Sequence, residues 1–183
     1  MSPHRLRRAI RNLAAGGLVA HPTEGVWGLA CDPGQRQAVD TLPATKRRAA
    51  NKGLILVAGD IEALRPWLMN PPPPAALGDW PGPITWLLPA AEAVPAWLSG
   101  GRTTIAVRVT AHRLTAALCR AWGGALVSTS ANRGGRPPAL NAWQLRRQLG
   151  RQPDLILTGD LDQPGKPSAI RDADGRYLRG GRQ

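Results

Sequence analysis

The sequence is poor in several residue types, and each shortage excludes a class of protein. Its two cysteines, Cys31 and Cys119, are too few for a disulfide framework, and neither has a Cys or His neighbour at metal-ligand spacing. A reduced, cytoplasmic protein without a metal site is therefore expected. No apolar run reaches membrane-spanning length, and Gly16, Gly17 and His21 interrupt the apolar positions that follow the arginine-rich start. Neither a signal-peptide core nor membrane insertion is expected.

Several catalytic and nucleotide-binding motifs are also missing. The chain has no G-x-x-x-x-G-K-[ST] segment and no G-x-G-x-x-G after a strand, so any nucleotide must be held in another way. The absence of G-x-S-x-G and H-E-x-x-H argues against standard serine hydrolases and zincins. His4, His21 and His112 are scattered without a nearby carboxylate or thiol, so structural or solvated roles are expected for them.

Acidic residues are scarce, and the charge of the chain is strongly positive. Twelve Asp and Glu face 24 Lys and Arg, which gives a net charge of +12 and a pI of about 11.5. A polyanionic partner or substrate is expected. Only three of the cations are lysines, a bias that favours bidentate recognition of phosphate or carboxylate but could equally reflect genome composition. With 43% hydrophobic residues, the chain can form a core, and we expect a single domain over residues 1–183.

Apolar periodicity and turn residues predict alternating helices and strands. Expected helices cover 6–13, 35–42, 114–122 and 141–149, with another after Asp60; expected strands cover 18–20, 54–58, 84–88, 104–109, 125–128 and 155–157. Asp174-Gly175 is a hairpin signal between 169–170 and 177–178. Loops are expected at 21–28, 45–52 and 128–132, and the proline-rich stretch 71–83 is interpreted as a stiff connector. The predicted fold class is α/β: one domain with a twisted, mixed parallel and antiparallel sheet, flanked by helices and carrying a basic concave cleft.

Cations and hydroxyls stand out at the ends of these elements. Lys46-Arg47-Arg48 with Lys52 is either a solvated basic turn or a phosphate clamp. The run Ser128-Thr129-Ser130-Ala131-Asn132 is either an ordinary polar turn or a binding loop. Arg108 lies inside an apolar strand pattern, where a charge is costly unless it faces solvent or an anion.

Six segments, in order along nearly the whole chain, resemble the motifs of one family. They are His21 to Pro33 (P-T-E-T-x-Y-G-L-x-C-D), Lys46 to Ile55 (K-x-R…L-I), Trp80 to Thr85 (W-P-G-P-x-T), Ala106 to Val109 (V-R-x-P), Ser128 to Asn132 (S-x-S-A-N) and Pro167 to Ile170 (S-T-I). The chain thus resembles the YrdC/TsaC family of L-threonylcarbamoyladenylate synthases, in its short single-domain form.

The resemblance implies a nucleotidyltransferase that combines L-threonine, bicarbonate and ATP into threonylcarbamoyl-AMP and releases pyrophosphate. Mg²⁺ accompanies the ATP, and the product supplies downstream threonylcarbamoyl-transfer proteins for t6A modification at position 37 of tRNA. Such chemistry depends on positioning two anions in a positive cleft and needs no His or Cys nucleophile.

The resemblance also implies roles for individual residues. The residues implied to bind threonine are Thr23, Arg108, Ser128 and Ser168. Those implied to surround ATP are Lys46, Arg48, Lys52, Thr104, Ser130, Asn132 and Arg179, with Lys46 and Arg48 taken as catalytic.

The sequence departs from the family motifs at several positions, and one other class of function stays open. Trp27 replaces the usual Tyr and is expected to act as an apolar wall, while Gly25 and Ala49 replace other usual residues. The alternative function is an RNA-binding or ribosome-maturation factor that uses the basic face, because residues 133–151 hold five arginines and no acid. Aromatic residues for base stacking are sparse, with no Phe and one Tyr. A carbamoyl-transfer module is a third, weaker interpretation.

Overall fold

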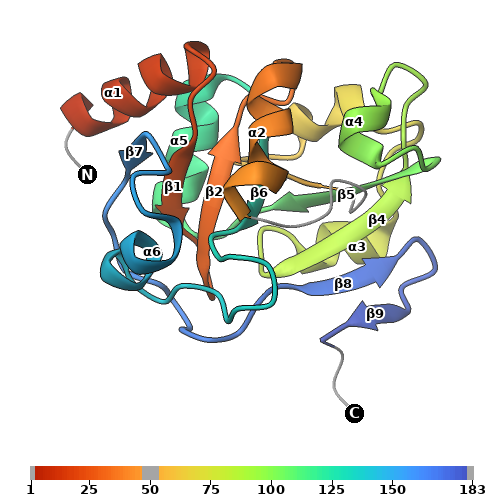
Figure 1. Cartoon of the computed structure of the whole chain (residues 1–183). Coiled ribbons are helices and arrows are strands. Elements are labelled where there is room, and N and C mark those ends of the chain that lie inside the picture. Colours follow the sequence, from red (N-terminus) through yellow and green to blue (C-terminus); the bar gives the residue numbers. More distant parts are fainter. Residues whose placement is uncertain (1–2, 47–53, 181–183) are drawn as a thin grey trace.

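A nine-stranded mixed sheet organises the molecule (Figure 1). The computed structural model describes residues 3–46 and 54–180. The sheet order is β7-β1-β2-β6-β3-β5-β4-β8-β9, with β1/β7, β3/β5 and β4/β8 parallel and the other pairs antiparallel. The strands are β1 (Val19–Pro22), β2 (Trp27–Cys31), β3 (Ile55–Ala58), β4 (Ile84–Pro89), β5 (Thr104–Val109), β6 (Leu126–Ser130), β7 (Leu155–Ile156), β8 (Ala169–Asp172) and β9 (Tyr177–Arg179). The predicted mixed α/β sheet is confirmed.

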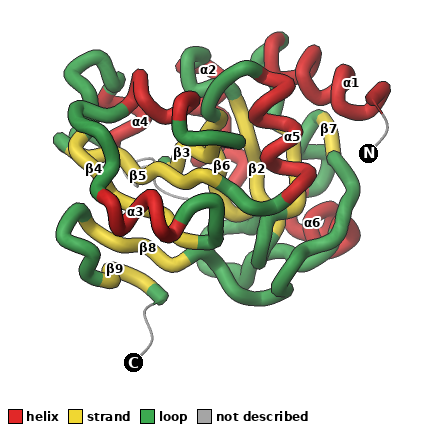
Figure 2. The backbone as a smooth tube through the Cα atoms, turned by 180° about the vertical axis from the view of Figure 1, so that it is seen from behind, coloured by secondary structure: helices red, strands yellow, loops and turns green. Residues whose placement is uncertain are grey.

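Helices cover both faces of this sheet and create two apolar cores. On one face, α1 (Pro3–Ala14) and α5 (Arg113–Trp122) pack together over a core that includes Leu13, Val57 and Leu118 (Figure 2). The larger core includes Leu42, Leu56 and Trp86. It receives side chains from the remaining helical segments: α2 (Arg36–Lys46), η1 (Glu62–Trp67), α3 (Pro74–Asp79), α4 (Ala96–Ser99) and α6 (Ala142–Leu149). Within the described ranges, no helix is long and apolar enough to cross a membrane.

Elements with strong local signals are confirmed. Strand β5 begins and ends where expected, Asn141 caps α6 by accepting the Gln144 N–H at 2.8 Å, and Gly175 adopts a φ of 85° in the β8–β9 hairpin. Asp60 accepts the N–H of Ala63 at the start of η1.

Two expectations about loops are wrong, and a third is wrong in the part that the structure describes. The segment 21–28 is mostly strand, because residues 21–22 complete β1 and residues 27–28 begin β2; only residues 23–26 connect them. Ser128 to Ser130 lie in β6 between two neighbouring strands rather than in a loop after it. The loop expected at 45–52 does not begin at residue 45, because α2 continues through Pro43 and ends at Lys46; residues 47–52 lie outside the described residues. Strands β1, β2 and β6 are buried on both faces, so their sequences lack the alternating pattern that marks a half-exposed strand.

The proline-rich stretch is more structured than a connector. Pro74 opens helix α3, where the missing N–H of a first-turn proline costs no hydrogen bond. The four-residue helix α4 was not expected, since one turn carries no periodic signal.

Candidate functional site

A pocket of about 530 Å³ opens over the middle of the sheet. Alternate residues of a strand share one face, which explains why Thr104, Ala106 and Arg108 of β5 all line it, together with Ser128 and Ser130 of β6. The β1–β2 connection closes another side of the pocket with Thr23. The C-terminal hairpin region closes a further side with Ser168, Leu178 and Arg179. Trp27 belongs to the wall, as expected.

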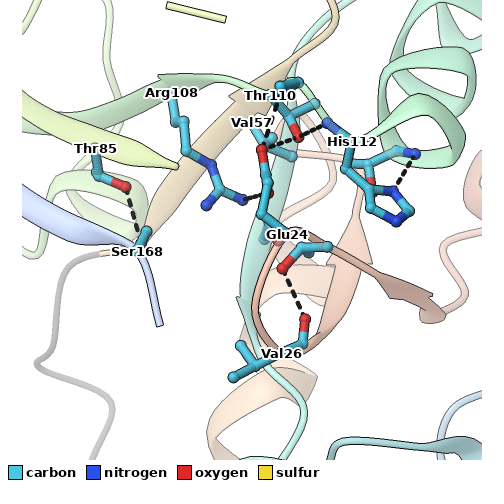
Figure 3. Close-up of polar contacts among 12 residues, drawn as sticks. Glu24, Val26, Val57, Thr85, Arg108, Thr110, His112 and Ser168 are labelled. Carbon is cyan, nitrogen blue, oxygen red and sulfur yellow. Dashed lines mark hydrogen bonds and ion pairs between the residues drawn. The ribbon is translucent and has the colours of Figure 1, made fainter. Parts of the chain in front are cut away.

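Arg108 is the buried charge of this pocket. Its side chain points toward Glu24 (Figure 3), with its Nη2 atom 3.5 Å from the Glu24 Oε2 atom, and both side chains are more than 90% buried. The other carboxylate oxygen of Glu24 accepts hydrogen bonds from the Thr110 hydroxyl (2.7 Å) and the Ala111 N–H (3.0 Å). Burial opposes ionisation of Glu24, but Arg108 and these hydrogen bonds outweigh it and lower the pKa of the carboxyl. Within the described part of the chain, Arg108 Nε has no hydrogen-bond partner.

A second arginine and two hydroxyls lie near Arg108. The Arg179 guanidinium donates to the Ser168 carbonyl (2.9 Å) and to its hydroxyl (3.4 Å), and Thr85 donates to the same hydroxyl (3.2 Å). Partial burial, together with the Arg108 charge, lowers the pKa of Arg179. Two cations therefore act on the same cavity. The Thr23 hydroxyl donates to the Val26 carbonyl at 2.7 Å, so it presents lone pairs to other partners.

Lys46 reaches from the end of α2 to the end of β6. Its buried ammonium donates to the Thr129 hydroxyl (3.1 Å), the Ser130 hydroxyl (3.2 Å), the Ser130 carbonyl and the Asn132 side-chain oxygen (3.4 Å). Ser130 in turn donates to Asn132 at 2.6 Å. One polar network thus joins Lys46, Ser130 and Asn132, three residues that the family resemblance implies to surround ATP.

The structure brings most of the sequence-predicted site residues together. Those that line the pocket are Thr23, Thr104, Arg108, Ser128, Ser130, Ser168 and Arg179. Lys46 and Asn132 connect to it through Ser130. Arg48, Ala49 and Lys52 lie outside the described residues. The basic concave form of the cleft stays a prediction.

Glu24 is the main residue that the sequence analysis missed. The signal was present, because a buried Arg108 requires a counter-charge, and Glu24 directly follows Thr23. The sequence alone does not show that Glu24 and Arg108 lie next to each other in the fold. Arg102 also lines the pocket and was not expected there.

Gly25 explains why the segment before β8 can lie against the β1–β2 connection. A Cβ at this position would lie 1.7 Å from the Lys166 carbonyl oxygen. Two backbone hydrogen bonds hold the same contact, from Gln163 N–H to the Glu24 carbonyl and from Gly165 N–H to the Gly25 carbonyl. The glycine thus permits the approach that places Ser168 at the pocket.

Comparisons with known proteins identify the family. The family profile Sua5_yciO_yrdC, described as telomere recombination, matches residues 11–181. The chain is 56% identical to the threonylcarbamoyl-AMP synthase of Alkalilimnicola ehrlichii over 174 residues, covering 93% of this chain and 92% of that protein. It is 50% identical to that of Nitrosococcus oceani over 181 residues, covering 96% and 97%.

Solved structures agree on the fold. P. abyssi Sua5 complexed with L-threonine superposes with a TM-score of 0.88 at 30% identity, covering 94% of this chain and 52% of Sua5, so the chain spans about half the length of that protein. E. coli YciO superposes with a TM-score of 0.81 at 24% identity, covering 93% and 84%, which supports the fold alone.

The chain therefore belongs to the Sua5/YciO/YrdC family, in its short single-domain form. Its enzymatic class within that family is nucleotidyltransferase, and its activity is that of a threonylcarbamoyl-AMP synthase.

Proposed function

We propose that the pocket holds L-threonine and ATP side by side and joins them through bicarbonate into threonylcarbamoyl-AMP and pyrophosphate. The observation that carries this assignment is the convergence of Arg108 and Arg179 with several hydroxyls on one cavity that no Asp or Glu among the described residues lines. Such a cavity favours anions that also carry hydrogen-bonding groups.

Threonine occupies the end of the pocket formed by Thr23, Arg108, Ser128 and Ser168. Its carboxylate faces Arg108, whose Nε is buried with no hydrogen-bond partner in the described residues and thus suits an incoming anion. The substrate hydroxyl donates to Thr23 and accepts from Ser168. This assignment agrees with the hydrogen bonds in the pocket, because Thr23 already donates its proton while Ser168 accepts from Thr85 and Arg179.

ATP occupies the end formed by Lys46, Thr104, Ser130, Asn132 and Arg179. Arg48 and Lys52, which follow α2 in the sequence, complete the phosphate site in this proposal. The side-chain hydrogen bonds between Lys46 and β6 support it, because they hold a buried ammonium at the strand end that borders the pocket.

The reaction requires positioning more than covalent catalysis. The threonine amine and bicarbonate give a carbamate and one molecule of water, as a C–N bond forms and a C–O bond of bicarbonate breaks. A carbamate oxygen then attacks the α-phosphorus of ATP, and pyrophosphate leaves. Cations on both sides of the reacting atoms bring two anions together and stabilise the charge on the departing pyrophosphate. Mg²⁺ enters as part of the MgATP substrate. The described residues contain no cluster of His, Cys, Asp or Glu able to hold a metal, so the nucleotide itself would supply the anionic ligands.

The product supplies threonylcarbamoyl-transfer proteins that act on position 37 of tRNA, in the cytoplasm. The direct test is incubation with L-threonine, bicarbonate and MgATP, followed by pyrophosphate release and mass detection of the adenylate. L-Valine in place of threonine should lower pyrophosphate release by about tenfold or more, since it leaves Thr23 and Ser168 without their partner. Equal release with both amino acids would overturn the assignment.

Variants of two arginines separate the threonine site from the phosphate site. In the folded protein, Arg108→Ala should weaken threonine binding by about 2 to 4 kcal/mol, because a bidentate pair in a partly dry site is lost. It should also lower stability, because Glu24 loses its buried partner. Arg48→Ala should mainly lower turnover. Arg48→Lys should keep more activity than Arg108→Lys, because a point charge still neutralises phosphate but does not form a fork on a carboxylate. Calorimetry with threonine together with steady-state kinetics measures both effects. Normal threonine binding by Arg108→Ala would contradict the assignment.

RNA contact is a second candidate function, through the surface of α6 and its flanks. Trp143 is 64% exposed, and the Arg147 guanidinium lies 4.8 Å from its ring centre. Five arginines and no acid occur between residues 133 and 151. A stacked, basic surface suits RNA phosphates and bases. Binding to a tRNA transcript at increasing salt tests it; a shallow slope of log affinity against log salt would argue against many phosphate contacts.

A further inference from the structure

His21 is fully buried, yet it lies directly behind the pocket wall. It belongs to β1, is 0% exposed, and its ring bridges two elements. The Nδ1 atom lies 3.0 Å from the Thr115 hydroxyl of α5 and 3.2 Å from the Pro22 carbonyl. The Nε2 atom lies 3.4 Å from the hydroxyl of Ser128, a residue of the pocket lining.

The hydrogen bonds around Nδ1 assign the tautomer of His21. The Thr115 hydroxyl donates its one proton to the Pro22 carbonyl at 2.6 Å. Both oxygens near Nδ1 therefore act as acceptors, and the ring proton must lie on Nδ1. The other ring nitrogen, Nε2, then carries a lone pair that faces Ser128. Burial of the ring also lowers the pKa of His21 to about 4, so the ring is neutral at pH 7.

This tautomer fixes the polarity of Ser128. A neutral Nε2 can only accept, so the Ser128 hydroxyl donates its proton toward His21, and only its lone pairs remain for the pocket. A serine oriented in this way rejects carboxylate and phosphate oxygens and accepts a hydrogen bond from an N–H group. Arg108, in the same pocket lining, has the opposite preference.

We propose that His21 is a positioning residue that makes Ser128 an obligate acceptor for the α-amino group of threonine. The inference rests on the proposed function, because it takes threonine as the ligand whose carboxylate faces Arg108. The amino group and the carboxylate share one carbon, so opposite preferences at Ser128 and Arg108 select an α-amino acid in a single orientation.

Gly28 supports this geometry from the neighbouring strand β2. A Cβ at Gly28 would lie 2.9 Å from His21 Nε2 and 3.1 Å from Ser128 Oγ. A methyl group here would push apart the two atoms that the proposal pairs. Gly28→Ala is therefore a second, independent way to break the same contact while both side chains remain.

The test compares binding of L-threonine with binding of 3-hydroxybutyrate, which lacks the amino group. We expect His21→Phe and Ser128→Ala each to reduce the preference for threonine by about tenfold, the typical effect of losing one hydrogen bond to a charged group. The double variant should lose no more than either single variant, because both remove the same contact. His21→Gln, whose amide oxygen can accept from Ser128, should recover part of the preference, while Gly28→Ala should lose it.

His4→Phe is the control for loss of a histidine, since His4 is an exposed residue of α1 outside the pocket lining. Its preference for threonine should equal that of the parent protein. Additive losses in the double variant, or an unchanged preference in folded His21→Phe, would overturn the proposal. Should His21→Phe fail to fold, an unchanged preference in Gly28→Ala would do the same. Failure of the parent protein to prefer threonine at all would instead contradict the proposed threonine site.

Discussion

Replacing Glu24 by Gln should destabilise the protein strongly, because Arg108 would keep its charge without a buried counter-charge. The two groups lie 3.5 Å apart and are each more than 90% buried. With an effective dielectric constant of about 20, their attraction is about 5 kcal/mol. Loss of one partner of a buried pair costs about 3 to 5 kcal/mol. The Gln side chain can still accept from Thr110 and Ala111, so the change isolates the charge.

Urea or thermal unfolding measures this loss directly. A cost of about 3 to 5 kcal/mol corresponds to a melting temperature lower by about 10 °C for a chain of this size. The control is Glu62→Gln, because Glu62 pairs with Arg65 at 2.6 Å but both side chains are about two-thirds exposed. That exposed pair should contribute less than about 1 kcal/mol. Equal, small effects of both substitutions would refute the view that Glu24 compensates Arg108.

Threonine should partly rescue Glu24→Gln. In the proposed site its carboxylate supplies the anion that the variant lacks, so saturating threonine should raise the melting temperature of the variant more than that of the parent protein. Identical increases would mean that the carboxylate binds elsewhere in the pocket.

Three further changes test other parts of the structure. Folding lowers the pKa of His21 from 6.5 to about 4, so the unfolded chain binds more protons between these pH values, and stability should fall as the pH drops from 6.5 toward 4. His21→Gln should flatten this part of the stability profile, measured by urea unfolding. An unchanged slope would contradict the assignment. Gly25→Ala should raise the KM for threonine more than that for ATP, because its Cβ would displace the Lys166 carbonyl and the segment that carries Ser168; equal changes in both KM values would speak against it. Arg146→Ala with Arg147→Ala should leave threonine-dependent pyrophosphate release nearly intact, and its loss in a folded double variant would assign α6 to the active site.

The sequence predicted those parts of the fold that depend on local chemistry. Asn141 caps α6 because its side chain competes well for a free N–H, and Asp174-Gly175 forms a hairpin because glycine tolerates a positive φ. These two features need no knowledge of distant partners. The grouping of Thr23, Arg108 and Ser168 in one site came instead from the family resemblance, and all three line the pocket.

The parts that could not be predicted depend on pairing across the fold. Strand β2 lies between β1 and β6 and is buried throughout, so its residues follow neither a helical nor an alternating pattern. Its Gly28 resembled a loop signal but instead provides room beside His21 and Ser128. Glu24 was missed for the same reason, since Arg108 lies more than 80 residues away in the sequence.

The buried ionisable groups indicate how such a site achieves chemistry. Burial raises the pKa of the Cys31 and Cys119 thiols to about 12 and lowers that of His21 to about 4, so these potential nucleophiles and bases are neutral at pH 7. The charge that the described pocket lining presents therefore comes from arginines, whose protonation does not respond to ordinary pH changes. Such a catalyst lowers the barrier by the positions of its charges. Substitutions that move a charge by a small distance should therefore reduce the rate in graded steps rather than abolish it.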